Sequence, residues 1–332
     1  MRIPLKQMTD LVRYLSRKKR SGEKYFPLVL MLEPLHACNL ACIGCGRIVE
    51  YKDTIRDQMP LDEALGAADE ADAPIVSICG GEPLMYKHIV ALTKGLIERR
   101  RHVQICTNAL LLERFVKHVE PNPYLSFNVH IDGMKETHDR VVDRDGVFDT
   151  CVKMIKMLKE KKYRVQTNTT VFRETTADEL EELIKMLTAL KVDGMLVTPG
   201  YHYQVLTNDI YLKNDEMPAK FRRVKKLAED YKIINTPIYL EYLTGDRDLL
   251  CSPWTTVTRN PRGWKGPCYL ITNGHYQSFK EMHAATDWEY YRTKQDFRCR
   301  DCKLHSGFEG TTALEFGKNF RDSYKMVRHA LS

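Results

Sequence analysis

Six stretches of strand character alternate with helical stretches between residues 28 and 232 of this 332-residue chain. A series of βα units predicts a parallel sheet, because parallel neighbours must be joined by crossovers that are usually helices. A complete eight-unit barrel typically takes about 250 residues, so six units in a shorter span favour a partial barrel. The expected strands are residues 28–33, 75–79, 102–107, 125–131, 164–171 and 194–198, and the expected helices are residues 61–72, 86–100, 109–119, 149–162, 177–190 and 216–232.

The segment before this barrel is strongly basic. Residues 1–24 hold eight Lys or Arg and two acidic residues, so they carry +6 of the net charge of +7. A nucleic-acid groove would spread its basic residues over the body of the fold, so we expect no nucleic-acid partner. Apolar residues of the arm recur at helical spacing, which predicts a basic amphipathic helix with two alternative uses, membrane contact or packing on the open bottom of the barrel. These residues are Leu5, Met8, Leu11, Val12 and Leu15.

The segment after the barrel changes character again, because Pro and Gly punctuate a loop-rich stretch with four cysteines. We therefore expect an N-terminal arm of residues 1–24, a barrel of residues 25–235 and a small cysteine-containing domain of residues 236–332. No run approaches 18 uninterrupted apolar residues, and no secretory signal precedes the first strand. Both features favour a cytoplasmic protein, in which clustered cysteines are more often metal ligands or redox groups than disulfides.

Three cysteines shortly after the first strand are the strongest chemical signal. Cys38, Cys42 and Cys45 stand on one loop with the spacing C-x3-C-x2-C. A [4Fe–4S] cluster usually takes four thiolates, so three local thiolates would leave one iron free to bind a substrate. A structural zinc instead needs a closed shell of four protein ligands, and His36 is the candidate for the fourth ligand in that alternative.

This cysteine motif at the end of a first barrel strand resembles the radical S-adenosylmethionine (SAM) superfamily, and the resemblance extends from residue 27 to about residue 200. It implies an α/β fold, a partial (β/α)6 radical SAM barrel, and a [4Fe–4S] cluster whose free iron chelates SAM. It also implies an enzyme that uses an electron donor such as flavodoxin or ferredoxin. One electron from the cluster then cleaves SAM to methionine and a 5′-deoxyadenosyl radical.

Further motifs follow in the order of that superfamily. The segment Gly80-Gly81-Glu82-Pro83 follows the second strand, where a side chain at the glycines would block the close approach of a ligand. The third, fourth and fifth strands also carry polar motifs, although His130 stands where relatives often have Ser. The resemblance implies that SAM is bound by Gly80, Gly81, Glu82, Asn108, Asn128 and Thr170.

One branch, the adenosylhopane synthases (adenosyl-hopene transferases) of bacterial hopanoid synthesis, is similar over nearly the whole chain. Residues 30–47, 128–133 and 259–270 carry this similarity, and Gly44 stands where many other relatives have an aromatic residue beside the adenine. The branch implies lipid biosynthesis by a transferase that joins the 5′-deoxyadenosyl group to the terminal alkene of diploptene. Because this triterpene is an insoluble hydrocarbon, we expect residues 5–20 to contact the inner face of the membrane peripherally.

The C-terminal cysteines form a looser set. The spacing Cys251-x11-Gly263-x4-Cys268, followed by Cys299-x2-Cys302, resembles the truncated auxiliary-cluster domain of other radical SAM enzymes. Four thiols suit a second [4Fe–4S] cluster or a zinc ion, and the third alternative is four reduced cysteines without metal. The same resemblance leaves a peptide- or protein-modifying radical SAM enzyme as an alternative function, and a non-catalytic zinc-binding interaction protein is a second one.

The implied addition to an alkene leaves a tertiary carbon radical that needs a hydrogen atom, and a thiol is the side chain that gives one up most readily. Cys79 and Cys106 both end barrel strands and would lie near the active mouth. Side chains alternate along a strand, so Val103 and Ile105 would face the helices and Cys106 would face the barrel interior. We therefore expect Cys106 to be the catalytic hydrogen-atom donor. The alternative is that it is a small buried residue.

Overall fold

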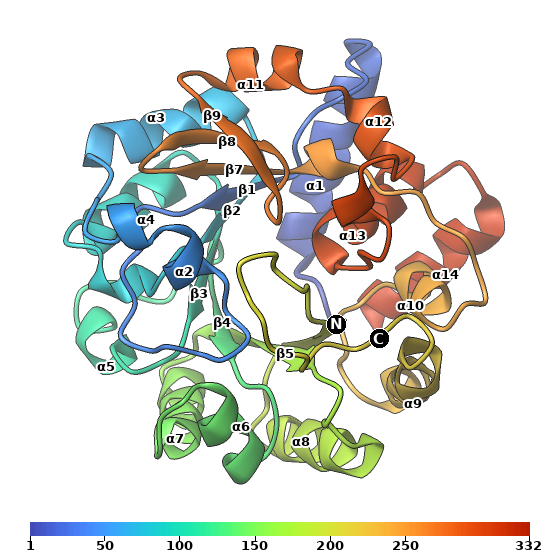
Figure 1. The fold of residues 1–332 in the computed structure, drawn as a ribbon. Helices are drawn as coiled ribbons and strands as arrows, with labels where there is room; N and C mark the ends of the chain where they lie inside the picture. The colour runs from blue at the N-terminus through green and yellow to red at the C-terminus, as the bar shows by residue number, and fades with distance from the viewer.

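The computed structural model describes residues 1–332 and contains a nine-stranded sheet (Figure 1). Six neighbouring strands, β1 to β6, are parallel and lie side by side in chain order, which confirms the predicted partial barrel of six βα units. The strands are β1 Val29–Leu32, β2 Ile75–Ile78, β3 His102–Thr107, β4 Leu125–His130, β5 Arg164–Val171, β6 Gly194–Pro199, β7 Thr256–Asn260, β8 Gly263–Pro267 and β9 Thr272–Tyr276.

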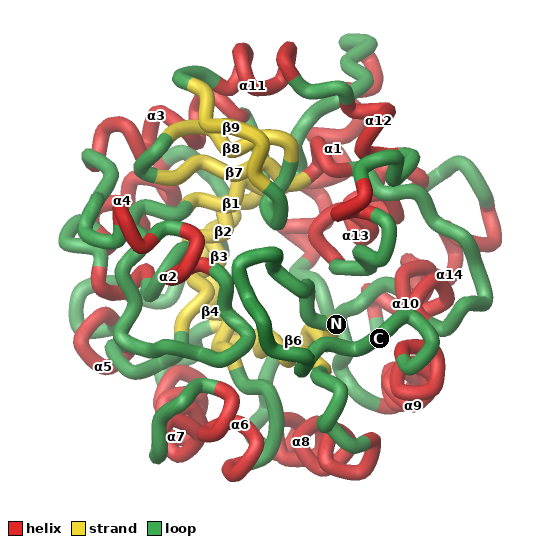
Figure 2. Tube along the Cα trace, viewed as in Figure 1, coloured by secondary structure: helices red, strands yellow, loops and turns green.

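Helices surround the outer side of the parallel strands (Figure 2), as the crossover connections require. They are α1 Leu5–Arg20, α2 Arg47–Glu50, α3 Leu61–Ala71, α4 Ile89–Glu98, α5 Leu112–Phe115, α6 Lys135–Val141, α7 Val147–Glu160, α8 Ala177–Ala189, α9 Met217–Asp230, α10 Pro237–Leu243, α11 Phe279–Ala285, α12 Trp288–Arg292, α13 His305–Glu315 and α14 Phe320–Leu331. No helix combines the length and the apolarity that a membrane span needs.

The helix expected over residues 109–119 is wrong in extent, because only the short α5 forms there. The residues before it make a tight turn in which Ala109 has a φ of 70°. The amide of Ala109 donates to the Thr107 hydroxyl, and the amide of Leu110 donates to the Asn108 side chain. These side chains therefore satisfy backbone groups locally and compete with helix formation.

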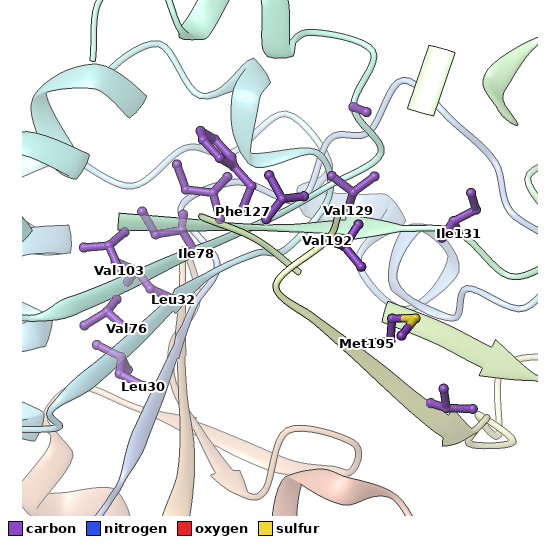
Figure 3. Packing of buried hydrophobic residues seen from close by; sticks show 14 of the residues in the cluster. Leu30, Leu32, Val76, Ile78, Val103, Phe127, Val129, Ile131, Val192 and Met195 are labelled. Atoms are coloured by element: carbon purple, nitrogen blue, oxygen red, sulfur yellow. The ribbon is translucent and has the colours of Figure 1, made fainter. Parts of the chain in front are cut away.

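The hydrophobic core lies between the parallel strands and the surrounding helices (Figure 3). Leu30 and Leu32 of β1 and Val76 and Ile78 of β2 are completely buried in it. Alternate residues face the other way, into the barrel. In β5 every second residue is only partly buried, from Arg164 to Thr170. In β5 the alternation thus turns a polar face toward the barrel interior.

The cysteine-containing C-terminal domain that we expected after residue 236 shares the sheet of the barrel. β7 pairs in parallel with β1, and β8 and β9 extend the same sheet in antiparallel fashion. The sheet therefore crosses the expected boundary. All five residues of β7 are buried although four of them are polar, from Thr256 to Asn260, so this strand has no apolar pattern in the sequence.

α1 forms as predicted and packs across the amino ends of the strands. Asp10 Oδ2 lies 3.0 Å from Nε2 of His102, the first residue of β3. The Tyr14 hydroxyl donates to the carbonyl of Pro27 just before β1, at 2.7 Å. Tyr14 and Leu15 are buried against the body of the protein, so one face of the arm closes the bottom of the barrel.

Candidate active site

A cavity of about 540 Å³ occupies the barrel interior, and side chains from all six parallel strands line it. Ligand sites in proteins usually have volumes of roughly 300–1,000 Å³. At the amino ends of the strands Ile3, Pro4 and Gln7 form part of the lining. At the carboxyl ends the cysteine loop, the glycine turn after β2 and polar residues of β3, β4 and β5 meet around it. The residues expected to carry the chemistry at the carboxyl ends therefore line one cavity.

The three thiols of the cysteine loop line this cavity together. They are free and only partly buried, and the amide of Cys45 donates to the carbonyl of Cys42 at 3.1 Å, which folds the loop back on itself. Burial raises the pKa of Cys38 to about 11 and raises the pKa of Cys42 as well. The Cys38 and Cys42 thiols therefore keep their protons at neutral pH, and thiols release their protons when a metal centre binds.

His36 is not placed to complete a zinc site with these thiols. Its ring stacks on Tyr51 with 4.0 Å between the ring centroids, and its Nδ1 lies 3.2 Å from the Thr54 hydroxyl. The lining of the cavity does not include His36. His36 therefore does not supply the fourth ligand of the zinc alternative, and the three-thiolate set suits a cluster with one open iron.

The glycine turn after β2 lies directly on the start of the cysteine loop. The amide of Gly81 donates to the Leu35 carbonyl, and the amide of Glu82 donates to the Ala37 carbonyl. A Cβ atom on Gly81 would lie 1.9 Å from the Ala37 carbonyl oxygen, and Gly80 has a φ of +109°. Only glycine fits both positions, so the turn can present its backbone to a ligand beside the thiols.

Glu82 ends this turn with a buried carboxylate. It accepts hydrogen bonds from the Thr107 hydroxyl at 2.7 Å, the Asn108 amide at 2.9 Å and the Leu84 amide at 3.1 Å. Burial outweighs these bonds and raises the pKa of Glu82 to about 7. A cationic group bound beside it, such as the ammonium of an amino acid, would favour the ionised carboxylate.

Two buried amide oxygens in the cavity wall are available to hydrogen-bond donors of a polar ligand. Oδ1 of Asn128 and Oδ1 of Asn168 are buried and have no hydrogen-bond partner. Buried acceptors are normally satisfied, so both are suited to donors of a bound molecule. Asn108 differs, because its Nδ2 donates to Asn39 Oδ1 at 2.7 Å, next to Cys38. Thr170 lines the cavity as well. The cavity thus gathers all the residues expected to bind SAM, and their individual contacts remain predictions.

A histidine–aspartate pair at the end of β4 is a feature that the sequence did not reveal. His130 Nε2 lies 2.6 Å from Oδ2 of the fully buried Asp132, whose Oδ1 accepts from the Thr170 amide at 2.7 Å. Burial lowers the pKa of His130, but the Asp132 charge outweighs it and raises the pKa overall. His138 accepts from the Asp132 amide, and burial lowers its pKa to about 4. The cavity therefore contains His130, whose protonated form is favoured, and His138, which stays neutral.

Cys106 points into the barrel, as the alternation along β3 predicted, and it lines the cavity. Its sulfur lies 3.2 Å from the Ser77 hydroxyl and 3.9 Å from Nδ2 of Asn128. Burial raises the pKa of Cys106. The residue is therefore a protonated thiol inside the same cavity as the cysteine loop.

Two glycines of the cysteine loop make room for aromatic rings. A Cβ on Gly44 would lie 3.0 Å from the ring of Phe172, which follows β5. A Cβ on Gly46 would lie 2.5 Å from the ring of Tyr203, which follows β6. Phe172 thus fills the space of the aromatic side chain that Gly44 lacks, and both rings line the cavity.

The four C-terminal thiols also meet around one small cavity. A Cβ on Gly307 would lie 2.3 Å from the Cys251 sulfur, so the glycine lets α13 approach this thiol. Lys294 Nζ donates to the Cys302 carbonyl at 2.9 Å and supplies a positive charge nearby. No three His, Cys, Asp or Glu side chains are arranged around a single ion anywhere in the structure. Occupation of this cavity by metal is therefore a proposal, to which we return below.

A buried ionic junction joins the two thiol sites. Arg47, two residues after Cys45, lies with Nη2 2.9 Å from Oε1 of the buried Glu33. The same nitrogen donates to the carbonyl of Tyr269, next to Cys268, at 2.9 Å. Lys265 also donates to this carbonyl, at 3.0 Å. The sequence did not reveal this network, because its members come from three distant segments.

Two family models match the chain in succession. Residues 32–187 match the model described as the Radical SAM superfamily, and residues 195–326 match the model described as a Domain of unknown function (DUF3463). The first match contains the three thiols, the glycine turn and the polar ends of β3 to β5. Residues 32–187 therefore form a radical SAM domain. The cofactors of this class are a [4Fe–4S] cluster and SAM, which the thiol set and the polar cavity fit.

Curated relatives are distant. The GTP 3′,8-cyclase of Clostridium perfringens (strain 13 / Type A) is 26% identical over 255 residues, which cover 70% of this chain and 77% of the relative. The AdoMet-dependent heme synthase of Methanosarcina barkeri (strain Fusaro / DSM 804) is 27% identical over 205 residues, which cover 60% of this chain and 56% of the relative. These relatives share the superfamily but do not identify a substrate for this chain.

Solved structures confirm the fold. Streptococcus suis SuiB bound to S-adenosylmethionine has a TM-score of 0.64 and 19% identity, and the match covers 83% of this chain and 68% of SuiB. The anSMEcpe structure with bound AdoMet and Cp18Cys peptide has a TM-score of 0.59 and 17% identity, and the match covers 92% of this chain and 97% of that one. At these identities the similarity shows the fold alone.

SAM binding is expected to strengthen as the pH rises from 6 to 8. In the SAM-free protein the pKa of Glu82 is about 7, so part of the population must lose a proton before the carboxylate can form the expected pair with the SAM ammonium. Glu82→Gln should weaken binding and remove the pH dependence. Anaerobic titration calorimetry at both pH values measures the two effects.

The raised pKa of Glu82 also predicts how the stability of the SAM-free protein changes with pH. The folded pKa of Glu82 is raised above the ordinary value of 4.5, so ionisation costs stability. The free energy of unfolding should therefore fall as the pH rises from about 4.5 to about 7 by on the order of 3 kcal/mol. Glu82→Gln should lack this component. An unchanged pH slope in the variant would show that another group titrates.

Proposed function

We propose that the chain is a radical SAM adenosyltransferase that joins a 5′-deoxyadenosyl group to the terminal CH2 of diploptene and so produces adenosylhopane. When bound, the cluster supplies the electron that cleaves SAM to methionine and the 5′-deoxyadenosyl radical. The observation that carries the proposal is the Cys106 thiol inside the barrel cavity. Addition to an alkene differs from hydrogen abstraction in that its last step needs a hydrogen atom.

Cys106 is suited to supply that hydrogen atom. Burial raises its pKa, so the sulfur keeps its hydrogen at neutral pH, and contacts with Ser77 and Asn128 fix its direction. In the proposed step the S–H bond breaks, and a C–H bond forms at the tertiary carbon of the adduct. The thiyl radical that remains takes up one electron from a flavodoxin- or ferredoxin-type donor and one proton, which restores the thiol.

The wall beside the cysteine loop supports an apolar substrate. Phe172 and Tyr203 pack where Gly44 and Gly46 lack side chains. Further apolar side chains contribute to the same cavity, among them Leu40, Ile48, Val141, Val142 and Pro199. A triterpene hydrocarbon offers no polar group, so it favours this apolar part of the wall over the polar part that holds Glu82 and Asn128.

Cys106→Ala tests the proposal directly. With diploptene, SAM and a reductant, the variant should still cleave SAM, but the saturated product should fall or its new stereocentre should become mixed. Chromatography with mass detection measures the product, whose mass must equal that of hopene plus an adenosyl group. Cys79→Ala removes the other thiol at the end of a neighbouring strand and should leave the product unchanged. Full yield with unchanged stereochemistry in Cys106→Ala would exclude this cysteine as the donor.

The same assay addresses the peptide- or protein-modifying alternative. SuiB and anSMEcpe, which resemble this chain in fold, have structures with bound peptides. That alternative predicts SAM cleavage without any adduct when diploptene is the only acceptor. An adenosylated hopene excludes it as the main activity.

The C-terminal thiol site is part of the proposal as a second metal centre. Cys251, Cys268, Cys299 and Cys302 line one cavity that shares the wall residues Tyr269 and Leu304 with the barrel cavity. A metal there would fix the loop of Cys268 and, through the Tyr269 carbonyl, the position of Arg47. The donor set suits a second [4Fe–4S] cluster or a zinc ion.

Because diploptene dissolves in bilayers, the proposal includes peripheral contact with the inner face of the membrane. Residues 5–20 are the expected contact. One face of α1 packs on the barrel, whereas Leu5 and Val12 stay exposed beside basic residues.

A further inference from the structure

The helix α14 exposes its apolar side chains to solvent, which is the reverse of an ordinary surface helix. None of its residues is buried, and the large apolar side chains that it exposes recur at helical spacing along one side. A surface helix normally turns such a stripe toward the core. The exposed side chains are Phe320 (88% exposed), Tyr324 (61%), Val327 (40%) and Leu331 (50%).

The inner face of α14 is held to the protein by polar contacts. Asp322 accepts two hydrogen bonds from the Arg247 guanidinium, both at 2.9 Å. Lys325 Nζ lies 2.6 Å from Glu241 Oε1. These two ion pairs lie on the side opposite the apolar stripe, so they fix the rotation of the helix with its apolar residues outward.

The charge around the stripe is uniformly basic. Arg321 and Arg328 are exposed on the same side of the helix, and Lys318 is exposed just before it. Asp322, the one acidic residue of residues 318–332, is turned inward. The segments 1–24 and 318–332 carry net charges of +6 and +3, and together they exceed the net charge of +7 of the whole chain. The two segments meet at the chain ends, which lie side by side (Figure 1), and the amide of Arg2 donates to the Ala330 carbonyl at 2.9 Å.

We propose that the outward face of α14, defined by Phe320, Arg321, Tyr324, Val327, Arg328 and Leu331, docks this protein on anionic lipid bilayers. The proposal rests on the membrane contact of the proposed function and makes α14 its main element, with α1 as the lesser one. An apolar stripe flanked by Arg and Lys suits the boundary between headgroups and acyl chains. A second copy of the chain fits worse, because two such faces would bring their arginines together.

Sedimentation of the full chain with vesicles tests the proposal. We expect binding to vesicles of phosphatidylcholine with phosphatidylglycerol and weak binding to pure phosphatidylcholine. A variant with Phe320→Ser, Tyr324→Ser and Val327→Ser should bind at least about tenfold more weakly, because it loses most of the apolar stripe. Arg321→Gln with Arg328→Gln should reduce the preference for anionic lipid.

Three controls separate the alternatives. Phe297→Ser removes an exposed aromatic ring elsewhere (67% exposed) and should leave binding unchanged. Leu5→Ser with Val12→Ser should have a smaller effect than the α14 variant; the reverse order would return the contact to α1. SAM cleavage by the α14 variant should equal that of the unaltered chain, which separates failure of docking from failure of the proposed reaction.

Two results would overturn the proposal. One is that the unaltered chain does not bind anionic vesicles, and the other is that the α14 variant binds them as tightly as the unaltered chain. A dimer in solution that the same substitutions dissociate would assign the face to a second copy instead. Circular dichroism checks that the helix remains folded, since the substitutions leave the inner ion pairs intact.

Discussion

Replacement of Cys38, Cys42 or Cys45 by alanine is expected to abolish both cluster assembly and SAM cleavage. The three thiols line one cavity, and His36, the other candidate ligand, is stacked on Tyr51 outside it. Each substitution therefore leaves two local thiolates and no spare ligand. After anaerobic reconstitution, iron analysis and the yield of 5′-deoxyadenosine measure the two losses.

Cys151→Ala is the matched control, because this buried cysteine lies in the hydrophobic core and belongs to neither thiol set. It should keep its cluster and cleave SAM. A variant in which all three cysteines of the loop are replaced also tests the second site, because any metal that this variant retains must be bound elsewhere. If the C-terminal thiols hold that metal, adding Cys268→Ser to this variant should remove the metal. Full SAM cleavage in any single-cysteine variant of the loop would refute the ligand assignment.

Gly81→Ala is expected to have the second-largest effect. The added Cβ would lie 1.9 Å from the Ala37 carbonyl oxygen, 2.4 Å from the Ala37 carbonyl carbon and 2.5 Å from the His36 carbonyl oxygen. All three are backbone atoms, so the turn or the cysteine loop must move. Overpacking of this kind costs on the order of 1–3 kcal/mol, and here it separates the turn from the thiols. We expect SAM binding to be lost in anaerobic titration calorimetry.

Gly66→Ala provides the comparison. Gly66 lies within α3, and a Cβ there would meet no atom within 4 Å. Alanine should stabilise this helix by roughly 0.5–1 kcal/mol, since glycine is the poorer helix former. SAM binding should be unchanged. If Gly81→Ala bound SAM as tightly as Gly66→Ala, the turn would not be part of the SAM site.

The barrel and the direction of Cys106 could be predicted from the sequence because both follow from short-range periodicity. Alternation of strands and helices gave the order of β1 to β6, and alternation along β3 turned Cys106 inward. The strand β7 could not be predicted in this way. Its residues are polar yet buried, and their partners come from the opposite end of the chain.

The same limit applies to the site. Motif spacing identified the thiols and the glycine turn, because each lies within a few residues of a strand end. The contact of Arg47 with Glu33 and Tyr269 needs three segments to meet in space, so no local pattern announces it. The periodicity of α14 was visible, but periodicity does not tell whether an apolar stripe faces inward or outward. The inner ion pairs of Asp322 and Lys325 decide that question.

The pairing of β1 with both β2 and β7 has a consequence for synthesis on the ribosome. β1 leaves the ribosome before β2 and β7, and one of its edges stays unpaired until residues 256–260 have also emerged. An unpaired edge of a parallel strand is a site for aggregation, so a nascent or truncated chain is exposed to chaperones and proteases for most of its translation. The cysteine loop follows this same strand. Iron loading before β7 arrives would therefore occur on an unfinished sheet, so we expect cluster delivery after β7 has paired with β1.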